Sequence, residues 1–273
     1  MVTNILNIIM SRKLKILTWN INSIRARAYQ LNQLIYDIQP DIILLQEIKC
    51  ESHNFPFQEI NESHKYNFSI NGQKSYNGVA ILSKFPLEDI KFTFLGNPCP
   101  DQARFIEANC LTEVGYVKVI SIYVPNGGEV NSDKFQIKLL FIDKFIKYLH
   151  SSKNLGESII LGGDFNVAPY DNDVYSAIEL QNTTCFTLPE KQYIRKLINH
   201  NFIDIYRLFH QRQKKFTWWD YRAGAFERNL GMRIDYILCT ISIALKATDC
   251  YIDYHTRNNH RASDHAPVIA SFE

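Results

Sequence analysis

Short runs of apolar, often β-branched residues recur along the chain and are separated by polar turns. Runs of this length and composition are typical of strands that lie inside a sheet. Ten strands are predicted, at Leu14–Trp19, Ile42–Leu45, Val79–Ser83, Ile90–Phe94, Arg104–Leu111, Val117–Val124, Ser158–Leu161, Ile234–Cys239, Lys246–Tyr254 and Pro267–Phe272. Helical patterns predict three helices, at Tyr29–Ile38, Asp133–Leu149 and Lys191–His200.

The helix predicted at Asp133–Leu149 has a clear amphipathic pattern. Its apolar face repeats every three or four residues, at Phe135, Leu139, Ile142 and Ile146. Four lysines punctuate the rest of the helix, at Lys134, Lys138, Lys144 and Lys147. A helix of this kind covers a core with one face and meets water with the other. We therefore interpret the lysines as a solvated face and not as a nucleic-acid patch.

Consecutive strands often follow one another with no room for a helix between them, so the sheets must be mixed and not purely parallel. Two sheets packed face to face, with helices outside, fit this pattern. Because no linker or short repeat interrupts residues 14–273, we expect a single domain there. Residues 1–13 lack the features of a signal peptide, and we expect a disordered extension or a misassigned start.

Composition excludes several classes of protein. With 273 residues, 46% hydrophobic and 21% charged, the chain is neither disordered nor low in core-forming residues. No apolar run approaches the ~20 residues of a membrane-spanning helix. The net charge of +2 means that a polyanionic partner would need a local basic surface. The six cysteines show no metal-binding spacing, so we expect free thiols, no zinc site and a cytoplasmic protein.

Polar side chains with catalytic potential stand where the apolar runs begin or end. One acid after a strand is usually a cap or a turn residue. Here five runs carry such groups, and loops at strand ends bring distant side chains together. Oxygen ligands of this kind suit a hard cation such as Mg²⁺. The residues are Asn20, Glu47, Asp164, Asn166, Asp235, Asp264 and His265.

The chain resembles the exonuclease III family of abasic-site endonucleases from about Leu14 to its end. The resemblance rests on WNINSIRAR, LLQEIK, YVPNGG, LGGDFNVAP, FTWWDYR, RIDYIL and SDHAPV, in this order. GGDFN and SDHAPV alone also fit the wider deoxyribonuclease-I-like superfamily of phosphoesterases, and the other segments narrow the match. A member of the family would be a mixed α/β protein, a four-layer αββα sandwich with its site at one end of two packed sheets.

The resemblance assigns a metal site. Glu47 matches the principal ligand of Mg²⁺, for which Mn²⁺ is a possible substitute, and Asn20 and Asp264 match positions beside the same ion. Asp164 matches the residue that activates or positions the attacking water, and Asn166 a donor to a phosphoryl oxygen; both also belong to the expected metal environment. The ordinary alternatives are a strand-terminal salt bridge for Glu47 and a tight turn for Asp164 and Asn166.

The resemblance also implies phosphate contacts. A carboxylate that holds an imidazole fixes its tautomer and raises its pKa. His265 matches a histidine that Asp235 pairs with and that contacts the scissile phosphate, and Tyr123 matches the active-site tyrosine. The alternatives are a backbone-bonded histidine at a strand end and, for Asp235, a buried partner of Arg233.

Expected contacts with the DNA substrate come from the segment FTWWDYR and from polar residues elsewhere in the chain. Trp218 matches a residue lining the pocket for an extruded sugar, whereas Trp219 is expected in the core. Extruding a nucleotide costs least where the base is already missing. Ser23 departs from the family, because many relatives have Gly there. Expected contacts with DNA come from Asn126, Arg222, which would reach into the duplex, Arg104, Arg25, Arg27 and Lys49; Asn126 could instead serve only in a turn.

The expected activity is therefore Mg²⁺-dependent hydrolysis of the phosphodiester 5′ to abasic sites in duplex DNA, leaving a 3′-hydroxyl. 3′→5′ exonuclease and 3′-phosphatase activity on blocked 3′ ends would accompany it, in a monomer with no membrane partner. The alternatives are a phosphatase or sphingomyelinase-like esterase of the same superfamily, a nuclease from a mobile element, and a catalytically silent DNA-binding module.

Overall fold

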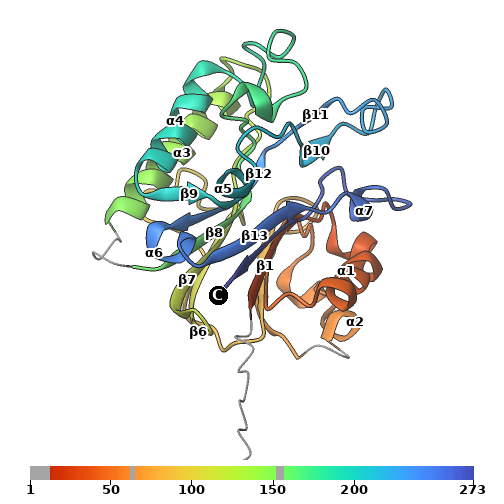
Figure 1. The fold of residues 1–273 in the computed structure, drawn as a ribbon, viewed down its shortest axis with the longest axis vertical. Helices are drawn as coiled ribbons and strands as arrows, with labels where there is room; N and C mark the ends of the chain where they lie inside the picture. Colours follow the sequence, from red (N-terminus) through yellow and green to blue (C-terminus); the bar gives the residue numbers. More distant parts are fainter. Residues whose placement is uncertain (1–12, 62–64, 152–156) are drawn as a thin grey trace, which may run out of the picture.

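The computed structural model describes residues 13–61, 65–151 and 157–273. The expected extension at 1–13 therefore lies outside the described residues, except for Lys13. None of the described helices is both long and apolar enough to cross a membrane. The described elements form two packed sheets with helices on both outer faces (Figure 1).

Both large sheets have six strands and a mixed topology, as the sequence predicts. The first sheet runs, from edge to edge, β13 (Ala247–Ile252), β14 (Val268–Phe272), β1 (Leu14–Asn20), β2 (Ile42–Gln46), β4 (Val79–Ser83) and β3 (Asn67–Asn71). The second runs β5 (Glu88–Lys91), β6 (Phe105–Thr112), β7 (Gly115–Tyr123), β8 (Ile159–Asp164), β12 (Asp235–Thr240) and β9 (Phe202–Asp204). A separate ribbon pairs β10 (Trp218–Trp219) with β11 (Gly231–Met232).

Helices complete the four layers that the family resemblance implies. α3 (Asp133–Ser151) and α4 (Leu188–Asn199) lie outside the second sheet, and α1 (Ile24–Ile38) and α2 (Phe57–Asn61) lie outside the first (Figure 1). The remaining helices are short and stand at strand ends: α5 (Ile205–Phe209), α6 (Ile241–Ala244), α7 (Tyr254–Arg257) and the 3₁₀ turns η1 (Ser52–Asn54) and η2 (Asp171–Asp173).

Each sheet contains one parallel pair near its centre, and these pairs define the site. β1 lies parallel to β2, and β7 lies parallel to β8, whereas every other neighbour is antiparallel. Strands of a parallel pair end at the same edge of their sheet. Asn20, Glu47, Tyr123 and Asp164 therefore stand at carboxyl ends of central strands.

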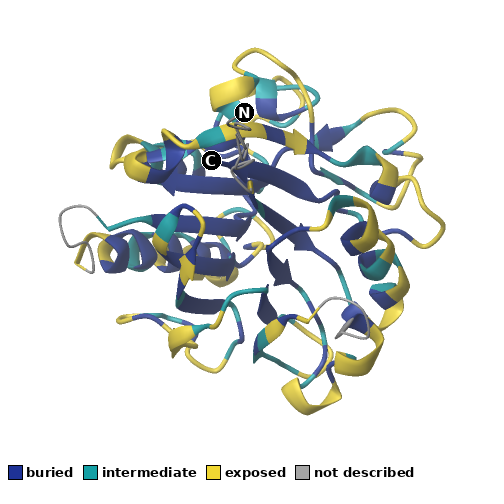
Figure 2. Ribbon diagram, turned by 60° about the horizontal axis from the view of Figure 1, so that its bottom comes forward, coloured by how far each residue is buried: buried dark blue, intermediate teal, exposed yellow. Residues whose placement is uncertain are grey.

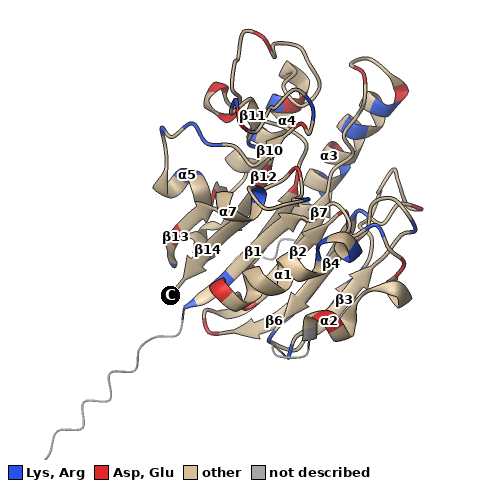
Figure 3. Ribbon diagram, turned by 90° about the vertical axis from the view of Figure 1, so that its right-hand side faces the viewer, with Lys and Arg blue, Asp and Glu red and all other residues tan. Residues whose placement is uncertain are grey.

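The core lies between the sheets and beneath the helices, where strands are buried almost along their whole length (Figure 2). Charged residues lie mostly on the surrounding helices and loops (Figure 3). Trp219 is fully buried, which confirms its expected place in the core. All six cysteines are free thiols, as predicted, and all six are buried.

Gly162 allows the two sheets to approach closely just below the site. A Cβ at this position would lie 2.6 Å from Cδ1 of Leu44 and 3.1 Å from Cβ of Thr18, both in the first sheet. Real Cβ atoms do not show the shorter distance, so a side chain here would displace the end of Leu44 and crowd Thr18. The first glycine of GGDFN therefore leaves room for these two side chains of the first sheet to pack against β8.

The sequence prediction misplaced some elements. The strand predicted at Ile90–Phe94 is β5, which ends at Lys91, and Phe94 packs edge-on against Phe105 and Phe141 instead. β5 is an exposed edge strand, so its pattern carries little apolar signal. β3, β9 and the β10–β11 ribbon were not predicted, because they are short or partly polar.

Two helices begin earlier than predicted. α4 begins at Leu188, because Thr187 and Glu190 form a reciprocal capping box with Pro189 in the first turn. α1 begins at Ile24 and not at Tyr29. Its N-cap, Ser23, makes no side-chain capping bond, so the usual sequence signal for a helix start is absent.

Lys138 corrects the interpretation of α3 as a helix with a solvated lysine face. Its side chain is fully buried, whereas Lys147 is exposed and pairs with Asp143 one turn away. Lys138 lies three residues after Phe135 and four before Ile142, so the helical repeat places it on the same buried face, near the N-terminal end of α3, where the helix meets the loops that end β7 and β8. Sequence periodicity alone does not reveal polar partners on other elements.

Ser23 adopts a backbone conformation with φ +88° and ψ +104°, which residues with a Cβ rarely adopt. This agrees with the expectation that glycine is the usual residue at this position. We expect Ser23→Gly to raise the free energy of unfolding by about 1 kcal/mol, because relief of strain exceeds the entropic cost of glycine. Urea denaturation measures the change.

The matched control is Ser23→Ala. The serine side chain makes no capping bond, so alanine keeps the same backbone strain and removes nothing that holds the helix. We expect its stability to equal that of the wild type within about 0.5 kcal/mol. A Ser23→Gly protein less stable than the alanine variant would contradict the strain argument.

Candidate active site

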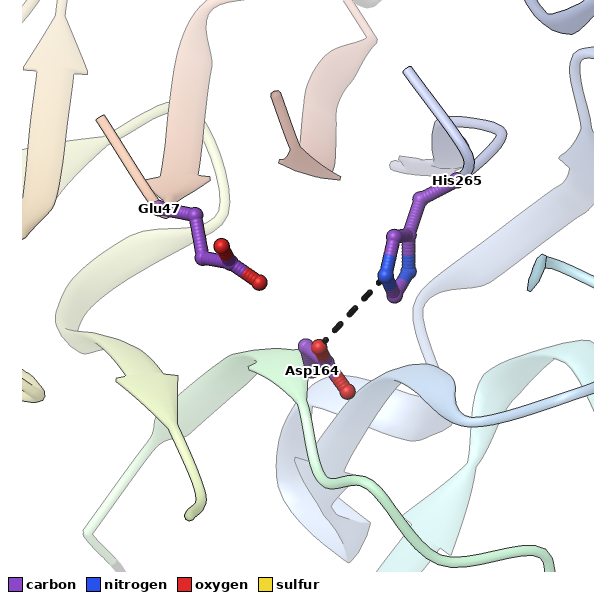
Figure 4. A group of neighbouring side chains, drawn as sticks. All are labelled: Glu47, Asp164 and His265. Atoms are coloured by element: carbon purple, nitrogen blue, oxygen red, sulfur yellow. Dashed lines mark ion pairs between the residues drawn. The ribbon is translucent and has the colours of Figure 1, made fainter. Parts of the chain in front are cut away.

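Side chains from both sheets meet at one end of the sandwich, around a cavity of about 380 Å³. Figure 4 shows Glu47, Asp164 and His265 converging from three different elements. Their ligand atoms all lie within 4.8 Å of one another. The cavity is lined by Glu47, Tyr123, Asn126, Asp164, Asn166, Thr184, Cys185, Trp218, Met232, Ile234, Asp264 and His265.

Asn20 connects the two carboxylates at the centre of the site. It is fully buried, and its Nδ2 donates to Oε1 of Glu47 and to Oδ2 of Asp164, at 2.9 Å each. Its Oδ1 accepts the backbone N–H of Asn22 at 3.1 Å. The amide therefore fixes the separation between one carboxylate from the first sheet and one from the second.

Glu47 follows β2 in a left-handed conformation, with φ +49°. Its Oε2 pairs with Nζ of Lys49 at 2.7 Å, so the salt bridge that the sequence left as an alternative does form. Burial raises the pKa of Glu47, but Lys49, Asn20 and His265 lower it below the usual value. Glu47 is thus a charged carboxylate at the edge of the cavity.

His265 and Asp235 form the predicted pair. Nδ1 of the buried imidazole lies 2.9 Å from Oδ2 of Asp235, and Nε2 lies 3.7 Å from Oδ2 of Asp164. Burial lowers the pKa of His265, but the carboxylates of Asp235 and Asp164 raise it to about 10. The imidazole is therefore protonated at neutral pH and offers N–H donors on both sides.

Asp164 stands at the end of β8, directly opposite Asp235 in the antiparallel ladder with β12. Its side chain is fully buried, and burial raises its pKa to about 7, although His265 and Asn20 favour the ionised form. Its Oδ1 accepts the backbone N–H of Asn166 at 2.8 Å. A carboxylate with a pKa near neutrality is well suited to exchange a proton with water.

Asn166 and Tyr123 complete the polar wall. Asn166 has a left-handed backbone, with φ +51°. Its Oδ1 accepts a hydrogen bond from Nδ2 of Asn126 at 3.0 Å. Tyr123 ends β7, and burial together with the negative charges of Glu47 and Asp164 raises its pKa well above the usual value. The phenol therefore remains protonated and can donate a hydrogen bond.

Asp264 joins the polar groups to the apolar wall. Its Oδ2 accepts the indole N–H of Trp218 at 3.0 Å, and its Oδ1 accepts the side-chain amide of Asn22 at 2.9 Å. Burial raises the pKa of Asp264, but His265 and these two donors lower it below the usual value. Trp218 thereby lines the cavity, as expected, beside Met232 and Ile234.

The acidic group at this end of the sandwich fits a metal ion. Glu47, Asp164 and Asp264 present three carboxylates to one cavity, and oxygen donors of this type suit hard divalent cations. His265 lies in the same cluster but is unsuited to ligation, because both of its nitrogens carry protons at neutral pH. The carboxylates are therefore the ligands that the structure offers.

Four of the residues predicted to contact DNA line two pockets near the cavity. Arg25 and Lys49 line a small pocket together with Lys74, and Lys49 also bonds Oδ1 of Asn22. Arg104 stacks on the ring of Tyr123 at 4.7 Å and lines a second pocket with Asn126 and Lys134. Asn126 is therefore shared between the second pocket and the main cavity.

Two predicted basic residues are engaged with the protein itself. Arg222 is 88% exposed and pairs with Asp220 through two side-chain bonds, at 3.0 and 2.7 Å. Arg27 donates to the backbone carbonyls of Asn22, Arg261 and Ala262, so it ties two loops together. The structure does not place either residue in the cavity.

Arg233 does not pair with Asp235, so that alternative is wrong. It is buried between Asp173 and Asp204, whose oxygens lie 2.7 and 2.8 Å from its nitrogens. Asp235 is instead held by Thr217, whose Oγ1 accepts its backbone N–H at 3.1 Å. The side chain of Asp235 therefore contacts His265, whereas Arg233 is buried with two other acids.

Sequence reasoning missed several residues that shape the site. Trp19 donates to the carbonyl of His265 at 3.0 Å, and Ser263 donates to the carbonyl of Asn20 at 2.7 Å. Met232 and Ile234 provide apolar surface beside Trp218. Met232 stands just before RIDYIL and pairs with Trp218 in the β10–β11 ribbon, and Ile234 is the second residue of RIDYIL, so their place in and beside this segment is the signal that could have found them.

Comparisons with known proteins identify the family. A model of the endonuclease/exonuclease/phosphatase family matches residues 17–265. The chain is 35% identical over 268 residues to exodeoxyribonuclease III of Haemophilus influenzae. The aligned region covers 95% of this chain and 100% of that protein.

Two solved structures are similar to this one. A 3′-phosphatase from Neisseria bound to a product DNA hairpin has a TM-score of 0.90 and 35% identity, covering 95% of this chain and 99% of that one. An AP endonuclease from Archaeoglobus fulgidus has a TM-score of 0.90 and 36% identity, with coverage of 95% and 99%. The chain therefore belongs to the endonuclease/exonuclease/phosphatase family and, within it, is an enzyme of the exonuclease III group of DNA-repair nucleases.

Proposed function

We propose that the protein is a Mg²⁺-dependent nuclease that hydrolyses the phosphodiester 5′ to abasic sites in duplex DNA and leaves a 3′-hydroxyl. One observation carries the proposal. A carboxylate base, a protonated histidine backed by Asp235, a phenol and an amide line the same cavity as the apolar wall of Trp218, Met232 and Ile234; Asp235 itself lies behind the histidine. The polar half suits a phosphate, and the apolar half suits a sugar without its base.

Asp164 is the proposed base. Its pKa of about 7 lets it take a proton from water at neutral pH, and no protein nucleophile is needed. Asn20 and the backbone N–H of Asn166 hold its two oxygens, so the carboxylate has a fixed orientation. Water bound to Asp164 would attack the phosphorus in line with the 3′-oxygen of the nucleotide that precedes the abasic site. The bond between phosphorus and this 3′-oxygen breaks, so the preceding nucleotide leaves with a 3′-hydroxyl and the abasic sugar keeps the 5′-phosphate.

Negative charge that develops on the phosphoryl oxygens needs donors already in place. His265, held by Asp235, presents Nε2–H to the cavity, and Tyr123 and Asn166 offer a phenol and an amide. Removal of one such donor costs about 10²–10³ in kcat. Because these groups act on one phosphate, their losses are not expected to add.

The proposed metal is Mg²⁺, with Mn²⁺ as a possible substitute, held by Glu47 with Asp164, Asp264 and the amides of Asn20 and Asn166 nearby. When bound, it would neutralise charge on the phosphate as a Lewis acid. Glu47 and Asn20 lie at the ends of parallel strands, so they hold this part of the site rigidly.

The DNA itself is proposed to cross the strand-end face. One pocket contains Arg104 and Lys134, and Arg104 stacks on Tyr123. Another contains Arg25, Lys49 and Lys74, and Lys49 pairs with Glu47. These basic side chains suit backbone phosphates. Arg222 stands free of the cavity on an exposed loop, where DNA could replace its pairing with Asp220. We propose that the enzyme acts as a monomer in the cytoplasm, where its six buried thiols stay reduced.

The test uses an end-labelled duplex with one tetrahydrofuran abasic analogue beside an intact duplex with a recessed 3′-phosphate. We expect a single incision 5′ to the analogue with Mg²⁺ and none with EDTA, together with slower release of the 3′-phosphate. Cleavage of small phosphoesters without any incision of abasic duplex would instead indicate an esterase of the same superfamily. Salt-dependent DNA binding without cleavage would indicate a silent binding module.

Glu47→Gln tests the metal assignment. We expect the Mg²⁺ concentration for half-maximal activity to rise by about 100-fold, because a neutral amide is a weaker ligand than a carboxylate. Affinity for abasic duplex, measured by fluorescence anisotropy in EDTA, should change by less than about threefold, since Glu47 does not belong to the basic pockets.

Glu51→Gln is the matched control for the metal site, because it removes the same charge from a residue that lines the Arg25 pocket and not the cavity. We expect its Mg²⁺ dependence to equal that of the wild type. Equal losses of DNA affinity and turnover in Glu47→Gln would contradict a metal-binding role.

A further inference from the structure

A buried lysine and its partners lie directly behind the active site. Lys138 of α3 and Glu190 of α4 form an ion pair in which both side chains are fully buried. Neither residue lines the cavity. Replacing a buried ion pair by apolar residues is often neutral or stabilising, so stability alone gives no reason for this arrangement.

The ammonium of Lys138 contacts the two loops that carry the catalytic amides. Nζ donates to the carbonyl of Asn126 at 2.9 Å, to the carbonyl of Asn166 at 2.7 Å and to the carboxylate of Glu190. An ammonium has three N–H donors, so each one has a partner. One side chain thus holds the backbone after β7 and the backbone after β8 at a fixed separation.

Glu190 fixes the lysine from the other side. Its Oε1 also accepts the backbone N–H of Cys185 at 3.0 Å, and its Oε2 accepts the backbone N–H and hydroxyl of Thr187, at 3.0 and 2.7 Å. The loop that contains Cys185 forms another part of the cavity wall. Three segments that line the site are therefore joined through one buried ion pair.

Asn126 and Asn166, whose carbonyls bond Lys138, both line the cavity. While their carbonyls bond Lys138, the side chain of Asn126 donates to Oδ1 of Asn166, and Nδ2 of Asn166 lies 3.3 Å from Oδ2 of Asp164. Asn166 also has a left-handed backbone, with φ +51°, which needs support from its surroundings. A shift of its carbonyl would move the amide that faces the phosphate.

Gly127 shows how closely the loop follows the lysine. A Cβ at Gly127 would lie 2.8 Å from Cδ of Lys138, and its φ of +94° suits glycine alone. The loop after Asn126 therefore packs directly against the aliphatic part of the Lys138 side chain. This contact and the two carbonyl bonds leave the segment little freedom to move.

We propose that Lys138 is a positioning residue that sets the catalytic amide of Asn166, through the carbonyls of Asn126 and Asn166, with Glu190 holding the lysine in place. The proposal rests on the function proposed above for the same site. It predicts that loss of the lysine donors lowers kcat while KM for DNA stays the same, because a small misplacement of a catalytic group costs up to about 100-fold in rate.

The experiment compares Lys138→Met/Glu190→Gln with Glu190→Gln. Glutamine keeps one carbonyl oxygen, for either Cys185 or Thr187, and both variants share this change, so their comparison isolates the lysine donors. The double variant has no unpaired charge, whereas Glu190→Gln leaves the ammonium with its two carbonyl partners. We expect kcat to fall about 10–100-fold in the double variant relative to Glu190→Gln, with KM within twofold. The control Lys118→Met/Glu157→Gln, at the opposite end of β7, should keep the wild-type kcat.

A second readout is independent of turnover. Side-chain amide NMR should show protected resonances for Asn126 and Asn166 in the wild type and in Glu190→Gln, and exchange-broadened ones in the double variant. If the double variant does not fold, Lys138→Arg takes its place, because a planar guanidinium cannot direct three donors as an ammonium does.

A kcat within twofold of Glu190→Gln, with unchanged amide resonances, would overturn the proposal. If the wild type cleaves neither abasic duplex nor 3′-phosphate, the proposed function fails, and the amide resonances still decide whether Lys138 positions Asn166.

Discussion

Asp164→Asn is expected to lower kcat on abasic duplex by about 10²–10⁴-fold, because an amide cannot accept the proton of the attacking water. The substitution keeps the shape of a side chain that is fully buried between Asn20 and His265. KM for DNA should change little, since the carboxylate lies at the bottom of the site and not in the basic pockets. Single-turnover kinetics with excess enzyme measures the chemical step directly.

The pH profile distinguishes loss of a base from general damage. The pKa of Asp164 is raised to about 7 by burial, so the wild-type rate should fall as the pH drops below about 7 and the carboxylate becomes protonated. Asp164→Asn should lose this dependence. Asp171→Asn removes an acid from an exposed turn outside the cavity and should behave as the wild type. A variant at position 164 with a near-wild-type rate would disprove the assignment.

The elements that build this site could be predicted because their signals are local. Buried strands are short apolar runs, and the polar residues that end them are visible in the sequence, such as Asn20 after KILTW and Asp164 after SIILGG. The parallel pairs β1–β2 and β7–β8 then bring these ends to one edge. The convergence of distant residues therefore follows from topology that the strand pattern already indicates.

The buried ion pairs of Lys138 and Arg233 could not be predicted, because their partners are distant in sequence. The pair of His265 and Asp235 is also distant, and it was predicted only from the family resemblance. Lys138 shares a helical face with Phe135 and Ile142, but only the packing of α4 and the β8 loop supplies the polar partners that allow a lysine to be buried there. Arg233 stands two residues from Asp235 but points to Asp173 and Asp204. Periodicity reports which face is apolar and does not report which polar group another element supplies.

The DNA contacts expected of surface arginines stay predictions. Arg222 pairs with Asp220, a neighbour two residues away, and Arg27 is used on backbone carbonyls. An exposed arginine has many possible partners of similar energy, so sequence position alone does not decide between DNA and the protein. The residues of the cavity floor are better determined, because burial leaves each polar group few partners.

His265→Ala and Asp235→Asn are each expected to lower kcat by about 10²–10³-fold. His265 carries a proton at neutral pH because Asp235 and Asp164 raise its pKa to about 10 despite burial, and alanine removes the donor altogether. Asp235→Asn leaves the imidazole in place but removes the carboxylate 2.9 Å from Nδ1 that fixes its orientation and charge. Rapid-quench kinetics on the abasic duplex, with thermal unfolding to confirm the fold, measures both losses.

The double variant separates a shared role from two independent ones. Asp235 is nearly fully buried and does not line the cavity, so it can reach a phosphate only through His265. Adding Asp235→Asn to His265→Ala should therefore lower kcat by less than about threefold further, although each single change costs far more. Losses that multiply would mean that Asp235 acts on the reaction by another route, for example through Asp164, which lies opposite it in the β8–β12 ladder.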